Sequence, residues 1–247
     1  MTSALSAYRA YREYLSLDTL LDLQKPNTGQ PDELLFVVVH QSHELWFKEL
    51  LHELGGLQAA LAAADSGHAL RTLRRLGAGF AVLTAQLRAL ETLTAGQFDA
   101  FRERLGGSGF YSAQFREIEL VLGRCDGDVA RQFPAGSPAR ARIEDRAGRP
   151  RLFASFLEYL AACGYPPHDV PLALRTVERD DAVAAQVCEG LRDLDQAFQE
   201  WRFQHAVLAR RVIGDKAGTG GSTGAEFLRA TVFTPSFPEL WHVPDPQ

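Results

Sequence analysis

Hydrophobic positions recur at helical spacing between residues 36 and 54. As a helix, this segment places six residues on one face, at steps of three and four: Phe36, His40, His43, Phe47, Leu51 and Leu54. Two imidazoles therefore fall within an apolar stripe, where a neutral polar ring needs a hydrogen-bond partner or a ligand. On this pattern alone, hydrogen-bonded core histidines are the favoured interpretation.

A second long segment, residues 181–214, repeats this arrangement. Its apolar stripe spans an arc of about 80° and consists of Leu194, Phe198, Trp201, His205, Leu208 and Val212. A lone histidine on such a face is more often structural than a ligand. However, two long helices that each present a histidine from an apolar stripe are what an all-α ligand pocket needs, and haem with one axial imidazole would suit it.

The remaining hydrophobic pattern also favours helices. They are predicted over residues 5–24, 31–64, 73–90, 96–105, 110–122, 152–163 and 226–232, with Gly, Pro and Asp clusters between them. Residues 124–150 are polar and rich in Arg, Gly and Pro, which predicts a loop region or short helices. No segment alternates with period two. The sequence predicts a single all-α domain over residues 1–247.

Composition and charge narrow the class of protein. A net charge of -5 argues against a nucleic-acid partner, because phosphate binding favours a basic surface. No run of about eighteen apolar residues predicts a membrane span, and the N-terminus has tyrosines and charges where a signal peptide needs an apolar run. The three cysteines are widely spaced and odd in number, as expected for free thiols. We expect a cytoplasmic protein that binds neither nucleic acid nor membrane.

Three other ligand sites compete with haem. Two E-x-x-H units, at residues 49–52 and 239–242, match di-iron proteins, but the second lies in the last ten residues and His52 lies off the stripe of His40. The H-x-x-H-E order of residues 40–44 is not the zinc motif H-E-x-x-H. The KAGTGGSTG segment at residues 216–224 resembles a phosphate loop only in composition. The order of its residues is not that of a phosphate loop, but it could still present backbone N–H groups to an anion or close over a ligand. A flexible connection between helices explains its composition equally well.

Several blocks of this sequence resemble the haem-dependent tryptophan 2,3-dioxygenase family. They occur in family order and cover nearly the whole chain: YREYL at 11–15, ELLFVVVHQSHELWFK at 33–48, Phe101–Arg102 with Ser108–Phe110, QFREIE at 114–119, WRFQH at 201–205 and IGDKAGTGGSTG at 213–224. The resemblance implies an all-α fold that binds haem b. It also implies an enzyme that uses O₂ and an indole amino acid.

The resemblance implies a role for each matching residue. His205 matches the axial ligand of the haem iron, which is ferrous in the active state. His40 matches the distal histidine that hydrogen-bonds the substrate indole N–H, as a base or as an orienting group. Arg102 matches the residue that holds the substrate carboxylate, and Thr219 a loop residue that contacts the charged groups of the amino acid. Phe36 matches a wall of the indole pocket.

Other matching residues imply an assembly. Tyr11, Tyr14 and Leu15 match residues that a neighbouring subunit contributes to the site, which implies a homotetramer with exchanged N-terminal segments. Ser108 matches a serine near the distal face of the haem, although the glycine turn beside it is one residue shorter here.

The implied reaction inserts both oxygen atoms of O₂ across the indole C2–C3 bond of L-tryptophan or a close derivative, giving an N-formylkynurenine-type product. Three features depart from the family pattern: a short 124–180 region, Phe98 in place of tyrosine, and His43 in place of a small residue or tyrosine. They leave two alternatives open, namely a monooxygenase that makes a hydroxylated or oxindole product from a substituted tryptophan, and a haem-binding sensor without turnover. Arg102 favours an enzyme, because a sensor of haem or gas would not need it.

Overall fold

The computed structural model describes residues 4–105, 111–166, 168–214, 216 and 232–241, and these residues contain no strand. The elements follow in the order α1 (Ala4–Tyr14), α2 (Leu17–Leu21), α3 (Glu33–Ala62), α4 (Ser66–Leu90), α5 (Ala95–Arg102), α6 (Ala113–Val121), η2 (Gly127–Gln132), α7 (Pro138–Ala147), α8 (Leu152–Ala162), α9 (Val170–Asp180), α10 (Ala182–Ile213) and α12 (Pro238–Trp241). The all-α prediction is confirmed. Within these ranges, none of the helices has the length and apolar character needed to cross a membrane.

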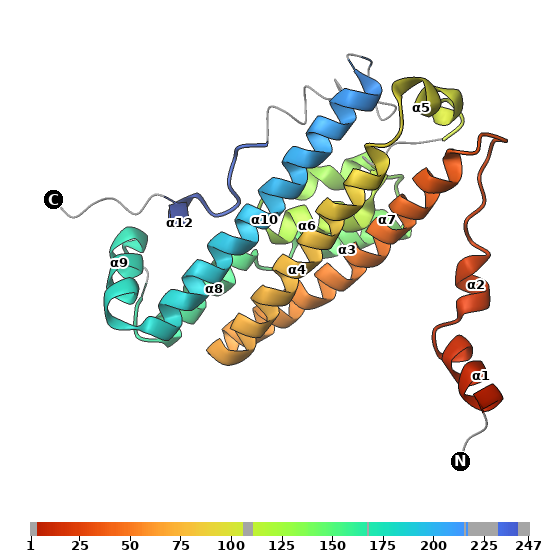
Figure 1. Ribbon diagram of the computed structural model, residues 1–247. Helices are drawn as coiled ribbons and strands as arrows, with labels where there is room; N and C mark the ends of the chain where they lie inside the picture. Colours follow the sequence, from red (N-terminus) through yellow and green to blue (C-terminus); the bar gives the residue numbers. More distant parts are fainter. Residues whose placement is uncertain (1–3, 106–110, 167, 215, 217–231, 242–247) are drawn as a thin grey trace.

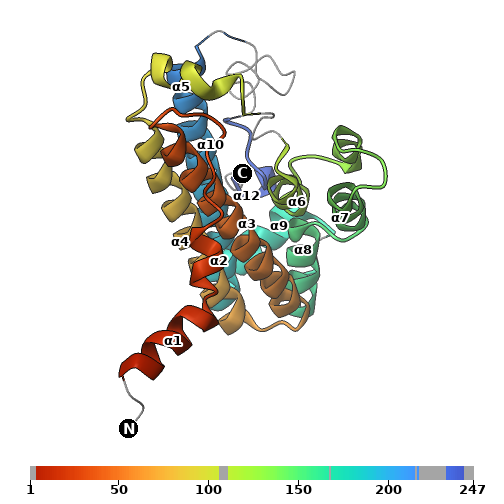
Figure 2. The ribbon, with the colours of Figure 1, turned by 90° about the vertical axis from the view of Figure 1, so that its right-hand side faces the viewer.

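Three long helices, α3, α4 and α10, form the centre of the molecule and run side by side (Figures 1 and 2). Two glycines allow α4 to approach its neighbours closely. A Cβ atom on Gly79 of α4 would lie 2.8 Å from Leu50 of α3, and one on Gly190 of α10 would lie 2.9 Å from Leu73 of α4. Real side chains do not tolerate such distances, so both positions require glycine or a shift of the leucine.

Shorter helices cover this centre. α6 and α8 pack on α3, while α9 packs on α10. Residues 124–150, predicted as a loop region or short helices, contain η2 and α7, which pack with α6 around a second small apolar cluster that includes Phe133 and Ile143. Helix α7 begins favourably, because the Ser137 side chain accepts a hydrogen bond from the Arg140 N–H and Pro138 occupies the first turn.

The bounds of the two long histidine-bearing helices agree with the sequence pattern to within two residues. At the start of α10, the Asp181 carboxylate accepts hydrogen bonds from the backbone N–H groups of Val183 and Ala184, both at 3.0 Å. Helix α9 was not predicted. It follows a Pro-Pro breaker and buries only three residues, so its hydrophobic pattern is short. The helix predicted over 226–232 lies almost wholly outside the described residues.

The prediction of one continuous helix over residues 5–24 is wrong. The chain breaks at Ser16, which adopts a left-handed conformation with φ 49°, and two separate helices result. Neither α1 nor α2 contains a buried residue. Figures 1 and 2 show this N-terminal arm (residues 4–24) beside the bundle, with α1 directed away from it.

Candidate functional site

The N-terminal half of α3 directs two imidazoles toward α10. The His40 ring stacks on the Phe36 ring at a centroid distance of 3.8 Å, and its Nδ1 lies 2.8 Å from the Phe36 carbonyl oxygen. The His43 Nδ1 lies 2.9 Å from the Val39 carbonyl oxygen. Because a carbonyl oxygen only accepts, each Nδ1 carries the proton, and each Nε2 of the neutral ring offers a lone pair.

Helix α10 brings His205 to the same region. The His205 ring stacks on the Trp201 ring of the preceding turn, with centroids 5.5 Å apart and planes only 3° from parallel. Trp201 in turn contacts His43 of α3, at a centroid distance of 6.2 Å. The two predicted stripes therefore face each other, and the three histidines lie on either side of the α3–α10 interface.

Burial keeps these imidazoles neutral. The pKa of His205 is lowered to about 4, mainly by burial and in smaller part by the neighbouring His40, His43 and Arg202, which would repel another positive charge. Burial likewise lowers the pKa of His43 to about 4, against the opposing effect of its hydrogen bond to the Val39 carbonyl. The pKa of His40 is lowered for the same reason. Near pH 7, a neutral imidazole can bind a metal as a single ligand or accept a hydrogen bond, but it has little capacity for charge pairing.

The donor chemistry at His205 fits a haem iron. An imidazole must be deprotonated to bind a metal, and the lowered pKa of His205 meets that requirement. Among the described residues, none forms a hydrogen bond with the His205 ring, so a ring nitrogen remains for a ligand. The Trp201 ring that stacks on His205 packs in turn on Phe47 and Phe115, so aromatic side chains lie behind the ligand.

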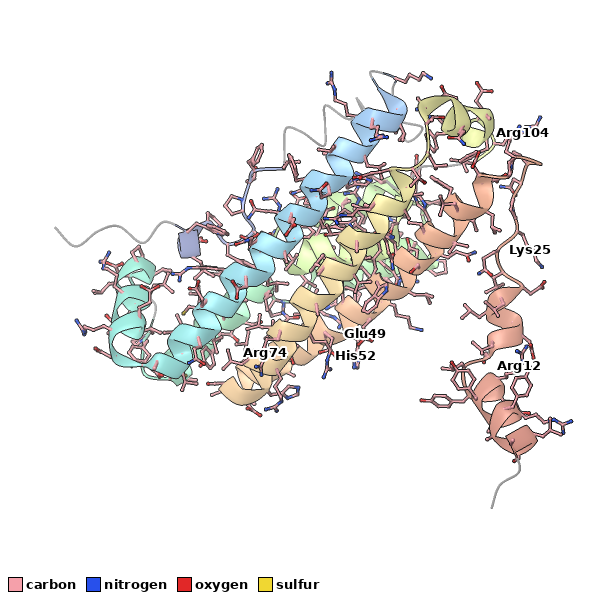
Figure 3. The ribbon with its side chains drawn as sticks, viewed as in Figure 1. Arg12, Lys25, Glu49, His52, Arg74 and Arg104 are labelled. Carbon is pink, nitrogen blue, oxygen red and sulfur yellow. The ribbon has the colours of Figure 1, made fainter. Side chains whose placement is uncertain are left out.

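Within the described ranges, no group of three or more His, Cys, Asp and Glu side chains could hold a metal ion. His40, His43 and Glu44, the residues considered for zinc, all lie within these ranges and therefore form no such group. Glu49 and His52, which form one of the E-x-x-H units, are exposed on α3 and lie away from the α3–α10 interface (Figure 3). His242, from the other unit, lies outside the described residues.

Helix α5 closes the Phe36 end of this region. Phe98 and Phe101 lie 5.7 and 5.6 Å from the Phe36 ring, centroid to centroid. A capping box fixes the start of the helix, because Thr94 and Gln97 satisfy each other's backbone N–H groups. Arg102 follows Phe101 at the end of α5 and is half-buried. The structure thus places Arg102 on the helix that packs against Phe36.

The glycine-rich segment starts near α5. Helix α10 ends at Ile213, and Gly214 turns the chain with φ 65°. Lys216, at the start of this segment, forms an ion pair with Asp99 of α5. Two of the predicted site residues, Thr219 and Ser108, lie outside the described residues.

The predicted residues of the N-terminal arm are not brought to this site within one chain. Tyr11 and Tyr14 are 61% and 88% exposed, and Leu15 is 40% exposed. Figure 3 shows Arg12 of the same arm well apart from the helices that carry the histidines.

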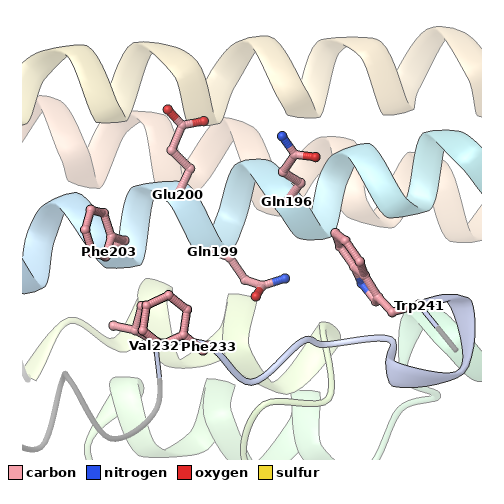
Figure 4. A pocket seen from close by; sticks show the side chains of 7 residues that line it. All are labelled: Gln196, Gln199, Glu200, Phe203, Val232, Phe233 and Trp241. Carbon is pink, nitrogen blue, oxygen red and sulfur yellow. The ribbon is translucent and has the colours of Figure 1, made fainter.

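The opposite face of α10 carries a surface groove of about 290 Å³, shown in Figure 4. Its lining consists of Gln196, Gln199, Glu200, Phe203, Val232, Phe233 and Trp241. By helix geometry, the α10 residues of this lining lie on the side away from His205. The groove is therefore separate from the histidine-lined region.

One buried carboxylate that holds the structure together was not identified from the sequence. Asp195 is almost fully buried in α10 and accepts hydrogen bonds from the backbone N–H groups of Ser236 and Phe237 and from Trp241 Nε1, at 2.9 to 3.1 Å. It anchors the C-terminal segment to α10. The sequence did offer one sign of it, because this acidic residue directly follows Leu194, which belongs to the apolar stripe of α10.

Comparison with known proteins gives a consistent result over the whole chain. The sequence profile of the tryptophan 2,3-dioxygenase family matches residues 2–132 and 174–245. A protein named tryptophan 2,3-dioxygenase from Anaeromyxobacter sp. (strain K) is 48% identical over 257 aligned positions, which cover 98% of this chain and 97% of that protein. Proteins of the same name from Herpetosiphon aurantiacus and Burkholderia pseudomallei (strain 668) are 43% and 35% identical.

These comparisons also qualify the expectation of an unusually short chain. The alignment covers 83% of the Burkholderia protein but 97% of the Anaeromyxobacter protein, so relatives of similar length exist. Residues 133–173, which the family profile leaves unmatched, fall within the region predicted to be shortened. On the match to the family profile and on these identities, the chain belongs to the tryptophan 2,3-dioxygenase family of oxidoreductases.

Proposed function

We propose that this protein is a haem-dependent dioxygenase that cleaves the indole C2–C3 bond of L-tryptophan and incorporates both atoms of O₂. The product is of the N-formylkynurenine type. One observation carries the proposal: His40 and His205 approach one region from two helices as neutral imidazoles, and Phe36 and α5 close one end of it. Membership of the family supplies the reaction class.

In this proposal His205 is the axial ligand of haem b. When bound in its ferrous form, the haem supplies the activation of O₂. The protein supplies a neutral ligand, an apolar environment and the orientation of the substrate. Trp201 stacks on His205 and keeps the imidazole plane fixed relative to α10.

His40 orients the substrate. Its Nδ1–H donates to the Phe36 carbonyl, so the Nε2 lone pair is available to accept a hydrogen bond from the indole N–H. The Phe36 ring, stacked on His40, forms a wall for the indole. Because burial lowers the His40 pKa, the ring stays an acceptor across the neutral pH range.

The charged groups of tryptophan need partners at the other end of the indole. Arg102, at the end of α5, is suited to hold the carboxylate, since a guanidinium can donate two parallel hydrogen bonds. We assign contacts with the amino acid to Thr219 and a position near the distal face of the haem to Ser108. The Lys216–Asp99 ion pair supports this assignment for Thr219, because it links the start of the glycine-rich segment to α5.

The N-terminal arm is assigned to self-association. Tyr11, Tyr14 and Leu15 present apolar surface that this chain does not cover, as expected for an arm that packs on a neighbouring subunit of a homotetramer. We place the protein in the cytoplasm, because all three cysteines are free thiols, as reducing compartments favour.

Product analysis under isotopically labelled O₂ tests the proposed reaction. Haem-loaded protein with L-tryptophan should give a ring-opened product that retains two label atoms. A single label atom in a ring-closed product would instead indicate the monooxygenase. Haem binding without product from tryptophan or ring-substituted tryptophans would indicate the sensor.

A further inference from the structure

His43 is a buried imidazole with one unsatisfied nitrogen. Only 8% of its surface is exposed, and its Nδ1–H donates to the Val39 carbonyl oxygen at 2.9 Å. Its Nε2 is buried and has no hydrogen-bond partner among the described residues. Since the neutral ring carries its proton on Nδ1, this Nε2 is a hydrogen-bond acceptor.

Trp201 presents the complementary group on the facing helix. It is 5% exposed, and its indole Nε1–H is buried without a partner among the described residues. An indole N–H can only donate. The His43 and Trp201 rings contact each other with centroids 6.2 Å apart. An unpaired donor and an unpaired acceptor therefore lie side by side.

Aromatic rings pack around this pair. Phe47 packs edge-on against both rings, at 5.9 Å from His43 and 6.0 Å from Trp201, and Phe115 lies 5.2 Å from Trp201. Buried polar groups in apolar surroundings are costly unless they are paired. A small rotation, or one water molecule that accepts from Trp201 and donates to His43, would satisfy both.

The pair is connected to the proposed haem ligand. Trp201 stacks on His205 with planes 3° from parallel, so an anchor on the Trp201 N–H also restrains the His205 ring. We infer that His43 and Trp201 act as a matched acceptor and donor, and that this pair positions the His205 imidazole. The role as a positioning pair rests on the proposed function of His205 as the haem ligand, whereas the pairing itself does not.

Nuclear magnetic resonance of the full-length, haem-free protein tests the pairing. The chain has three tryptophans, so ¹⁵N-indole labelling gives few signals, and the Trp241 N–H, bound to Asp195, is an internal control. His43→Phe should speed solvent exchange of the Trp201 N–H about tenfold, as expected for the loss of one net hydrogen bond. His43→Gln, which retains an acceptor, should restore slow exchange. Unchanged exchange in His43→Phe, with the Trp241 signal intact, would overturn the pairing.

The haem-loaded protein tests the positioning role. His43→Phe and Trp201→Phe should each shift the iron midpoint potential in the same direction. The double variant should shift it no further than the larger single change, because coupled residues are not additive. Independent, additive shifts, or no shift, would overturn the positioning role even if the pair exists. A protein that binds no haem would instead refute the proposed function and leave the exchange result standing.

Discussion

The α3–α10 interface and the N-terminal arm share one kind of sequence pattern but differ in structure. Both carry aromatic and aliphatic residues at helical spacing. In the interface these residues are buried, as for Phe47 of α3, which contacts Trp201 of α10 and is 4% exposed. In the arm they are exposed, as for Tyr14 at 88%. An apolar stripe therefore predicts that a face will be covered, but it does not say whether the same chain covers it.

This difference separates two kinds of functional residue. His40, His43 and His205 are brought together by one chain, through two helices that both pack on α4 and whose aromatic side chains contact each other. In the proposed assembly, Tyr11 and Tyr14 act through another copy of the chain. Changes in the interface should therefore affect folding and haem, while changes in the arm should affect assembly.

The largest difference is expected in stability. Phe47→Ala should lower the free energy of unfolding by about 3–5 kcal/mol, because it removes a buried ring that packs on Phe115 and Trp201. Tyr14→Ala should change it by less than about 0.5 kcal/mol when measured on dissociated subunits. Chemical denaturation of the two variants measures both values. Equal losses would contradict the division between interface and arm.

The next largest effect concerns pH. His43 has a pKa of about 4 in the folded protein, against about 6.5 unfolded. Between these pH values the unfolded chain therefore binds more protons than the folded protein. The free energy of unfolding should fall as the pH is lowered from 6.5 to 4, and His43 should account for about 3 kcal/mol of that loss. Denaturation of the haem-free protein across this range should show a weaker dependence in His43→Phe. If the free energy of unfolding depended on pH in the same way in both proteins, the buried neutral state of His43 would be refuted.

Removal of Arg102 should have a smaller effect, confined to substrate binding. Arg102→Ala should raise KM for L-tryptophan roughly 30-fold, as expected for the loss of about 2 kcal/mol from a charge-assisted contact. The matched control is Arg104→Ala, because Arg104 is exposed two residues further on (Figure 3). Steady-state kinetics that gave both variants the same KM would exclude Arg102 as the carboxylate partner.

The smallest effect on the fold is expected from the arm. Tyr11→Lys with Tyr14→Lys should leave the unfolding of dissociated subunits unchanged but should shift the assembly toward smaller species, because two buried charges would face the partner. Sedimentation velocity measures the species. If the variant and the unchanged protein showed the same distribution of oligomeric species, the arm would not be part of the proposed interface.

Much of the fold was predictable because its central helices have long stripes. The stripes over residues 36–54 and 194–212 predicted α3 and α10, and the flanking Pro, Asp and Gly residues placed the helix ends to within two residues. Helix α9 is short and follows prolines, so its three buried residues gave too weak a pattern. The break at Ser16 depends on a left-handed backbone conformation that serine rarely adopts, and no glycine marked it.

The sequence pattern predicted the three imidazoles of the candidate site, but only some of the residues that contact them. The stripes placed His40, His43 and His205 on inward faces, and the structure brings them together. The pairing of His43 with Trp201 depends on how α3 and α10 are rotated relative to each other. The hydrophobic pattern of one helix gives no information about that rotation. Asp195 is similar, since its donors come from a segment more than forty residues further along the chain.

Haem titration of two histidine variants tests the central claim most directly. His205→Ala removes the proposed ligand, and His52→Ala removes an exposed histidine of α3 as a control (Figure 3). The reconstituted wild type and His52→Ala should give the same histidine-ligated Soret spectrum, and His205→Ala should lose it. Added imidazole should partly restore that spectrum in His205→Ala. An unchanged Soret band in His205→Ala would contradict the assignment of the α3–α10 interface as the haem site.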